Sequence, residues 1–388
     1  MKSPRSSVVF VCLLVWIPCS IVYGQAAAEA QKAAALYAQA VGLHPEEKYA
    51  DAQARVKEAV ALAPQNARYQ DYLKQLAAVT GKQQLDQHAL QASAEAEQTV
   101  ASLAAYLVKG ARTDEDKARL IFRWIADRIA YDYEGFRAGK PGDNSPEGVL
   151  KNRKCVCAGY SSLYEALAKA AGLEVVKISG FSKGASYAPG RKPENHAWNA
   201  VKLNGRWQLL DATWGAGDAD AKGFRKRFKE YHFLMAPEEF VLTHLPRDPQ
   251  WQLLTPLVTT EEFESWPQVK GAFFRYGFSV ADIRQRLQVK DFRELVDVLD
   301  VPAGPKITIL QAPIIRRLKA GEKYKFRIDA PRFQSMAISN GPKPVRMTGS
   351  DGVFEAEATA EKGTMVIGGL PVNSTGKSYT GVLRYEVE

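Results

Sequence analysis

Residues 196–211 read HAWNAVKLNGRWQLLD, with apolar and polar residues alternating on both sides of Asn204-Gly205. An Asn-Gly pair between two such runs is the strongest short-range sequence signal for a β-hairpin with a two-residue turn. If these two residues form the centre of the turn, Leu203 pairs with Arg206, and the same register continues along both strands. The stretch therefore predicts two antiparallel strands whose register depends on one turn.

This register brings His196 and Asp211 onto one face of the hairpin. Trp198 would lie opposite Asp211, and His196 lies two residues from Trp198 on the same face. Diagonal neighbours of this kind are separated by about 7 to 8 Å between their backbones, a gap that an imidazole and a carboxylate can close. A three-residue loop or a bulge at the turn would instead put the two side chains on opposite faces. The sequence therefore predicts a His–carboxylate pair that depends on the turn.

A cysteine precedes the hairpin, at the predicted start of a helix. Residues 158–171 favour helix and Gly172 supplies a stop signal, so Cys157 lies at the amino end of that helix. Unpaired N–H groups and the helix dipole favour a thiolate there, whereas the alternative for this cysteine is a small buried hydrophobe. With the hairpin pair, it predicts a nucleophilic site in which Asp211 orients His196 and His196 takes the thiol proton.

The amino-terminal segment predicts export. Residues 1–24 begin with Lys2 and Arg5, continue through an apolar run too short to span a bilayer, and end in Gly24, which is the layout of a cleaved secretory signal. We therefore expect an exported protein of a bacterial periplasm, with no membrane span in its mature chain. The net charge of +9 falls to about +7 without the signal and is not gathered in a basic block, so nucleic-acid binding is not expected.

Cys155 and Cys157 remain once the signal, which holds the other two cysteines, is removed. A disulfide between residues two apart would close a strained ring that constrains little of the unfolded chain. A metal site of two thiolates with His196 or His232 is a further alternative, but zinc sites usually space their cysteines as Cys-x-x-Cys and add a second pair. We therefore expect a nucleophile, with no metal and no cofactor.

The sequence on either side of this region differs in character. Residues 25–110 show helical periodicity with proline stops at Pro45 and Pro64, which resembles a tetratricopeptide-type helix pair or forms a simple helical hairpin. From about residue 303, short alternating runs predict an antiparallel β-sandwich. The predicted parts are a signal peptide (1–24), an α-helical region (25–110), a mixed helix-and-sheet domain (111–275), a helical linker (276–302, with residues 280–300 as one or two helices) and a β-sandwich domain (303–388).

Two helix starts are predicted inside the mixed domain. Thr113, with Asp116 three residues later, forms a capping box for a helix that should end around Tyr131. Ser145 and Pro146 give a second start, with a cap and a proline at the first helical position. Both helices precede the cysteine segment.

Six ordered blocks of this domain resemble the transglutaminase-like superfamily of papain-related cysteine enzymes, and most of all its kyphoscoliosis-peptidase and Cyk3-like branch. They lie between residues 100 and about 275, a little under half of the chain. The blocks are DKARLIFRWI (116–125), IAYD (129–132), VCAGYS (156–161), NHAWN (195–199), WQLLDATWGAG (207–217) and HLPRDPQWQLL (244–254).

The resemblance implies an α+β fold in which a helix carrying Cys157 packs against an antiparallel sheet carrying His196 and Asp211. The family's catalytic cysteine maps onto Cys157, whereas Cys155 departs from the family pattern and either links reversibly to Cys157 or packs. The implied enzyme acts on amide bonds of proteins or peptides, by hydrolysis or by acyl transfer to an amine. The alternative is a noncatalytic interaction protein that uses this fold with its helical and β-sandwich flanks. Cell-envelope peptides are a substrate expectation that comes from the compartment alone.

Four further residues are expected to bind substrate or to support the site. Tyr160 belongs to the cysteine motif, and Trp198 and Trp214 flank the proposed site, where they would exclude water or pack in the core. The Cys157 backbone N–H is the expected oxyanion donor, with Tyr131 as a candidate for the second. The oligomeric state stays open.

Overall fold

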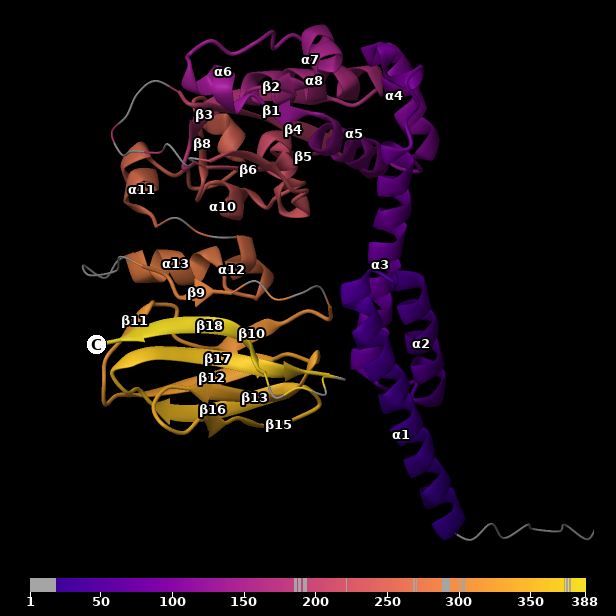
Figure 1. Cartoon of the computed structure of the whole chain (residues 1–388), viewed down its shortest axis with the longest axis vertical. Helices are drawn as coiled ribbons and strands as arrows, with labels where there is room; N and C mark the ends of the chain where they lie inside the picture. Colours follow the sequence, from indigo (N-terminus) through magenta and orange to yellow (C-terminus); the bar gives the residue numbers. More distant parts are fainter. Residues whose placement is uncertain are drawn as a thin grey trace, which may run out of the picture. The chain divides into compact units, whose positions relative to one another are not determined.

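Two compact units make up the chain, Met1–Ala77 and Ala78–Glu388 (Figure 1). The structure, a computed structural model, describes residues 19–388 apart from 185–186, 188–189, 191–193, 221, 268, 270, 288–293, 300, 302–303, 373, 375 and 377. Residues 1–18, most of the predicted signal segment, lie outside the described residues.

The first unit is an alanine-rich helical hairpin. Its first two long helices pack together, and Ala33, Ala40, Ala52 and Ala59 are fully buried, because methyl side chains let two helix backbones approach closely. A packed helix pair is common to both predicted arrangements, and each of the two helices ends just before its proline. The elements are α1 (Cys19–Leu43), the 3₁₀ turn η1 (His44–Glu46), α2 (Tyr49–Leu62) and the first part of α3 (Ala67–Leu90).

Helix α1 is continuous across the predicted cleavage point after Gly24. Among the residues that the structure describes, none of the helices has the length and apolar character required for crossing a membrane. The signal peptide remains a prediction.

The helical part of the second unit carries both predicted caps. The Thr113 hydroxyl accepts from the Asp116 backbone N–H and the Asp116 carboxylate accepts from the Thr113 N–H, and Ser145 caps the other helix through the Gly148 N–H, so both starts are confirmed. The elements are η2 (Ala96–Gln98), α4 (Val100–Leu107), η3 (Val108–Gly110), α5 (Asp114–Arg128), α6 (Tyr133–Arg137), α7 (Pro146–Asn152) and α8 (Cys157–Ala170).

Helix α5 ends three residues earlier than predicted. Ala130–Tyr131 forms strand β1, which pairs in parallel with β2 (Lys154–Cys155). Because both residues pair with β2, their backbone is extended, and Tyr131 is a strand residue and not the last residue of the helix. It also brings the segment after α5 beside the segment that leads into Cys157.

An antiparallel sheet lies behind α8. Its strand order is β5-β4-β3-β8, and α8 packs on β3 and β4 with Leu163, Tyr164 and Leu167 buried in the core that it shares with α5 (Figure 1). This is the transglutaminase-like arrangement that the resemblance implied, with the cysteine helix against the sheet. The strands are β3 (Val175–Ser182), β4 (His196–Leu203), β5 (Arg206–Leu210) and β8 (His244–Pro246).

Short elements connect this sheet to the last part of the chain. The elements are α9 (Ala212–Ala216), β6 (Gly217–Asp220), β7 (Gly223–Lys226), η4 (Glu230–His232), α10 (Pro237–Phe240), η5 (Pro249–Gln252), α11 (Thr260–Ser265), α12 (Gly271–Arg275) and α13 (Val280–Leu287).

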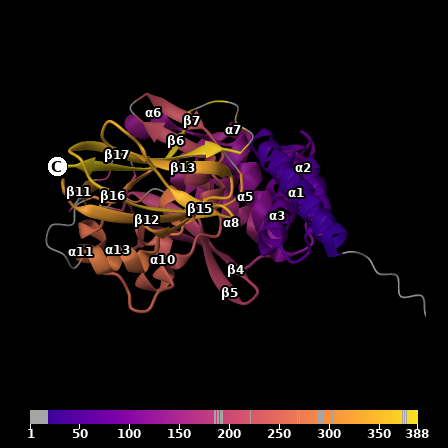
Figure 2. The ribbon, with the colours of Figure 1, turned by 90° about the horizontal axis from the view of Figure 1, so that it is seen from below.

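The carboxyl-terminal part forms two sheets of mainly antiparallel strands, as the alternating runs predicted (Figure 2). Phe326 and Ile328 of one sheet and Leu383 and Tyr385 of the other are buried in one core. One sheet contains β10 (Thr308–Gln311), β12 (Lys323–Asp329), β16 (Val353–Thr359) and β15 (Thr348–Ser350); the other contains β11 (Arg317–Leu318), β18 (Thr380–Val387), β17 (Gly363–Pro371), β13 (Phe333–Ser339) and β14 (Val345–Arg346).

The predicted helical linker is wrong near its end. Asp297–Val298 forms strand β9, in which Val298 pairs with Leu383 of β18. Val296 and Val298 are buried in the sandwich core, a position that β-branched side chains fill well in an extended chain. Residues 288–293, 300 and 302–303 of the linker lie outside the described residues.

Candidate active site

The hairpin has the predicted register. Leu203 pairs with Arg206 and Asn199 pairs with Leu210, so the Asn204-Gly205 turn contains two residues. Asn204 (φ 50°) and Gly205 (φ 76°) both have positive φ, which a type I′ turn requires of its two central residues. The register that is required for His196 and Asp211 to share one face of the hairpin is therefore confirmed.

His196 and Asp211 meet as this register implies. Nε2 of His196 lies 2.7 Å from Oδ2 of Asp211, and both side chains are buried. The other carboxylate oxygen, Oδ1, accepts the backbone N–H groups of Thr213 (2.8 Å) and Trp214 (3.1 Å), because Asp211 is the N-cap of α9. The helix cap thus fixes the carboxylate that holds the imidazole.

Cys157 is the first residue of α8 and contacts His196 from the other side. Its thiol lies close enough to the His196 ring for each group to shift the pKa of the other. Since Asp211 occupies Nε2, Nδ1 is the ring nitrogen left for the thiol. The structure therefore brings together all three residues of the predicted nucleophilic site.

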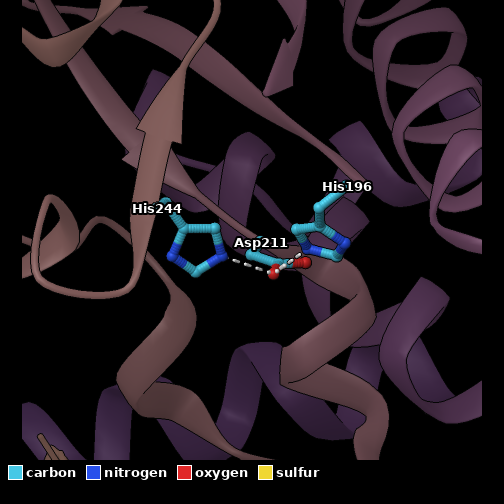
Figure 3. A group of neighbouring side chains, drawn as sticks. All are labelled: His196, Asp211 and His244. Atoms are coloured by element: carbon cyan, nitrogen blue, oxygen red, sulfur yellow. Dashed lines mark hydrogen bonds and ion pairs between the residues drawn. The ribbon is translucent and has the colours of Figure 1, made fainter. Parts of the chain in front are cut away.

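A second histidine shares the same carboxylate. Nε2 of His244, on β8, lies 3.2 Å from Oδ2 of Asp211, so this oxygen lies between two imidazole rings (Figure 3). His244 belongs to the last of the six blocks but was not predicted as a site residue. It is 33 residues beyond Asp211 in the chain, and no local sequence pattern predicts that the two residues meet. They are brought together because β8, which carries His244, pairs with β3 on the side opposite to β4.

Gly180 on β3 makes this neighbourhood possible. It pairs with His196 on one side and with Pro246 on the other. A Cβ atom there would lie 2.3 Å from the Leu245 carbonyl oxygen and 2.7 Å from the Trp198 ring. The missing side chain lets the histidine strands approach from both sides.

The charges of the site favour a thiolate–imidazolium pair. Burial acts to raise the pKa of Cys157, but its hydrogen bond with His196 and the charge of that ring outweigh burial and lower the pKa below its ordinary value. Burial acts to lower the pKa of His196, but the charge and hydrogen bond of Asp211, with the thiol bond, raise it to about 10. A partly buried cysteine whose pKa is lowered in this way is a stronger nucleophile near neutral pH.

Asp211 stays ionised in spite of complete burial. Desolvation acts to raise the pKa of its carboxyl group, but the charge and hydrogen bond of His196 and the hydrogen bond of His244 hold the pKa well below its usual range. Burial is also the main reason that the pKa of His244 falls to about 4. At neutral pH His244 is therefore an uncharged ring.

The two cysteines have different environments. Cys155 is fully buried in the same core as Tyr160 and Leu163, and burial raises the pKa of its thiol. Cys157 is only partly buried, and both residues are free thiols. Of the two predicted roles for Cys155, packing is the one that the structure shows.

A metal site does not follow from the nearby ligand atoms. His196, Asp211 and His244 each place one such atom within 4.8 Å of the others. The two Nε2 atoms, however, lie at hydrogen-bond distances from one carboxylate oxygen, and so they satisfy that oxygen directly. The thiolate alternative with His232 has no support from this group, which includes neither cysteine.

The four supporting residues take different positions. Tyr160 is fully buried and its hydroxyl donates to the Ile129 carbonyl at 2.9 Å, which ties α8 to the end of α5. Trp198 is buried with its ring 6.0 Å from His196, whereas Trp214 is partly exposed with its ring 5.6 Å from His196. Tyr131 is half-buried, and burial together with the charge of nearby Cys157 raises its pKa, so its phenol stays protonated.

His232 completes the buried surroundings. Its backbone carbonyl accepts the Asp211 N–H at 2.9 Å, and its ring meets Trp214 edge-on. Burial lowers the pKa of His232 to about 3. Its side chain reaches neither Asp211 oxygen among the bonds that the structure records for described residues.

Residues 101–212 match the model of the transglutaminase-like superfamily. The chain carries a transglutaminase-like domain. The matched residues contain Cys157, His196 and Asp211 together with α8 and the hairpin. The resemblance that the sequence blocks suggested is therefore confirmed.

Curated relatives of the transglutaminase-like domain include kyphoscoliosis peptidase of Mus musculus, 36% identical over 176 residues that make up 44% of this chain and 27% of the relative. Hillarin of Drosophila melanogaster is 35% identical over 214 residues, 51% of this chain and 26% of the relative. Cytokinesis protein 3 of Schizosaccharomyces pombe is 23% identical over 184 residues, 45% of this chain and 20% of the relative. The matched part of the chain thus spans between a fifth and little more than a quarter of the length of these three proteins.

Two solved structures are also similar to parts of the chain. A protein described as a TGase shares 20% identity at a TM-score of 0.25, over 43% of this chain and 43% of that chain. A putative cysteine protease from Cytophaga hutchinsonii shares 21% identity at a TM-score of 0.21, over 29% of this chain and 35% of that chain.

Proposed function

We propose that the protein is a cysteine enzyme that acts on amide bonds of proteins or peptides through Cys157, His196 and Asp211. The observation that supports this most is the 2.7 Å hydrogen bond between His196 Nε2 and Asp211 Oδ2, on a ring that in turn lowers the pKa of the Cys157 thiol. In a catalytic triad of this kind, Cys157 at the start of α8 is the nucleophile, His196 is the base, and the Asp211 carboxylate orients the imidazole.

In the first half of the reaction, the Cys157 thiolate attacks the carbonyl carbon of the amide. The Cys157 backbone N–H belongs to the first turn of α8, where N–H groups lack acceptors within the helix, and it donates to the developing oxyanion. His196 then gives its proton to the leaving amine as the C–N bond breaks. The product is a thioester on Cys157.

In the second half, water or an amine attacks the thioester. His196, now neutral, takes a proton from this nucleophile, and Asp211 stabilises the imidazolium that forms. The C–S bond of the thioester then breaks, and its electron pair leaves with the Cys157 sulfur, which restores the thiolate beside the protonated His196. Water gives a carboxylic acid and makes the protein a peptidase or amidase, whereas an amine gives a new amide and makes it a transglutaminase.

Tyr131 is our candidate for a second oxyanion donor. Its phenol lies close enough to Cys157 and Asp211 for their charges to raise its pKa, although burial is the larger cause. A protonated phenol can donate one hydrogen bond, and β1–β2 pairing holds Tyr131 opposite Cys155, two residues from the nucleophile.

The proposal is tested first at the thiol. Wild type, Cys157→Ala, His196→Ala and Cys155→Ala are treated with iodoacetamide near neutral pH, and the labelled residue is found by mass spectrometry. We expect rapid labelling of Cys157 alone, retained in Cys155→Ala and slowed by at least about tenfold in His196→Ala. Equal and slow labelling of both cysteines in wild type would contradict an activated nucleophile and would favour the noncatalytic interaction protein.

The reaction and its substrate class are tested together. The full chain is incubated with a peptide library with and without a primary amine, and Cys157→Ala serves as the control for contaminating enzymes. Cleaved peptides indicate hydrolysis, and peptides that gain the amine indicate acyl transfer. If the folded protein is labelled at Cys157 as expected but neither cleaves nor modifies any peptide, action on peptide amides is contradicted.

Export is a separate part of the proposal. It is supported only by the charged start, apolar run and small residue of positions 1–24. Expression of the full chain in a Gram-negative host, with fractionation and intact-mass measurement, should give a periplasmic product that begins at Gln25. An uncleaved cytoplasmic product would rule out the proposed signal and with it the reason for expecting envelope peptides.

A further inference from the structure

We propose that His244 is a positioning residue of this site, which donates a second hydrogen bond to Asp211 Oδ2 and thereby limits the hold of Asp211 on the His196 proton. The inference rests on the proposed function, since it concerns how His196 releases a proton. It goes beyond the triad, because the His244 ring acts only through Asp211.

The first step is the saturation of the Asp211 carboxylate. Oδ1 accepts two backbone N–H groups, from Thr213 and Trp214, and Oδ2 accepts from His196 and His244. A fully buried carboxylate needs such donors, since each one lost leaves a desolvated anion less compensated. The four bonds also prevent the carboxylate from turning about its own axis.

The second step is the tautomer of His244. An ionised carboxylate can only accept, so the Nε2 atom that faces Asp211 must carry a hydrogen. Nδ1 of the same ring lies 2.8 Å from the Thr243 hydroxyl, whose single hydrogen can point to Nδ1 or to the Phe240 carbonyl at 3.3 Å. The sheet fixes the backbone position of His244, because β8 pairs this residue with Ser182 of β3. One neutral ring therefore accepts on one side and donates on the other.

The ring is also held in place by packing. It stacks on Phe240, with ring centres 4.1 Å apart and planes inclined by 25°, and it lies against Trp214 at 4.4 Å and Trp198 at 5.2 Å. The side chain is completely buried. An imidazole enclosed by three aromatic rings is a poor place for a positive charge without full compensation, which agrees with the lowered pKa of about 4.

The third step concerns charge. The titratable groups recorded as acting on His244 are Asp211, His196 and, from η4, His232. Of these, only Asp211 is an anion, and it is shared between the two rings. An N–H directed at Oδ2 takes up part of the negative charge that otherwise acts on His196. Without that donor Asp211 would hold the His196 proton more tightly, and a general acid has to release its proton to the leaving amine.

The experiment compares His244→Leu, which removes the donor, with His244→Gln, whose amide N–H can reach the position of Nε2. Cys157 is labelled with iodoacetate across the pH range, because an anionic reagent reacts faster while His196 is still an imidazolium. The alkaline limb of this profile reports loss of the His196 proton and needs no knowledge of the substrate. We expect the limb to move upward by about half to one pH unit in His244→Leu and to stay near the wild-type position in His244→Gln.

His232→Leu is the matched control, because His232 is a similarly buried ring against Trp214 that does not bond to the Asp211 side chain. It should leave the limb in place. If His244→Leu does not fold, His244→Asn replaces it: the shorter amide reaches the Nδ1 position, toward Thr243, and not the Nε2 position. An unshifted or lowered limb in the folded donor-free variant overturns the inference.

The outcome is separable from that of the proposed function. If wild type shows no selective labelling of Cys157, the proposed function fails before His244 is considered. If wild type is selectively labelled and His244→Leu matches it, only the inference fails. Stoichiometric zinc in the purified wild type that is lost in His244→Leu would also overturn it, since the ring would then be a metal ligand.

Discussion

His196 Nε2 and Asp211 Oδ2 lie 2.7 Å apart although fifteen positions separate the two residues in the chain. The hairpin register brings them together from one side, and the N-cap of α9 fixes the carboxylate from the other. The contact therefore depends on two local structures that meet at Asp211. This arrangement explains why a single carboxylate can orient the ring without support from solvent.

Replacing that carboxylate should separate geometry from charge. Asp211→Asn keeps the shape, but its amide nitrogen can face a histidine and favour the wrong tautomer, and it cannot stabilise an imidazolium. We expect peptide turnover to fall on the order of 10³- to 10⁴-fold with the fold retained. Asp220→Asn, at the partly exposed end of β6, is the control and should retain activity. A loss of less than tenfold in Asp211→Asn would contradict the proposed role.

The role of Tyr131 can be read from two measurements that should diverge. Tyr131→Phe removes only the hydroxyl, so iodoacetamide labelling of Cys157 should stay within about twofold of wild type. Turnover should fall by about 10- to 100-fold, because an oxyanion donor acts on the transition state and not on the thiol. Parallel losses in both assays would instead indicate that the ring packs the site without donating to it.

Stability should fall in mild acid. The folded-state pKa values of His244 (about 4) and His232 (about 3) lie below the ordinary value of 6.5, so the unfolded chain binds more protons as the pH falls below 6.5. The contribution of these two rings to stability is therefore fully present above about pH 6.5 and decreases toward pH 4. Urea unfolding at a series of pH values should show this slope, and His244→Gln with His232→Gln should flatten it. An equal slope in the double variant would be evidence against neutral burial of these rings.

The turn that sets the register makes its own prediction about stability. Gly205 has φ of 76° and open space around a would-be Cβ, so Gly205→Ala is penalised by backbone conformation alone, by about 1 kcal/mol. Gly81 also has open space, but it lies within helix α3, where Gly→Ala should stabilise by roughly 0.5 to 1 kcal/mol. Urea unfolding of the two variants should therefore give effects of opposite sign.

Local features were the ones that could be predicted. Asn204-Gly205 specifies a turn through the φ angles that these two residues tolerate, and the turn then fixes which side chains share a face. Thr113 and Ser145 specify helix starts through side chains that reach N–H groups three residues on. In each case the interacting atoms are close in sequence, so the pattern contains the cause.

Errors appeared where an element's partner lies far away in the chain. Residues 297 and 298 were predicted as helix, but they pair with β18 more than eighty positions later, and burial in the sandwich decides their conformation. Helix α5 ends earlier than predicted for a similar reason, since the residues that follow it form β1, which pairs with β2. Pairings of this kind leave no periodic signature within the strand itself.

The sequence by itself determined the register of the hairpin, the position of Cys157 at a helix start and hence the thiol, imidazole and carboxylate of the site. Only the tertiary structure decided that Cys155 is buried and that His244 shares Asp211. The reason is physical: helix caps and turns act over two or three residues, whereas burial and the pairing of β3 with β8 are set by how distant segments pack.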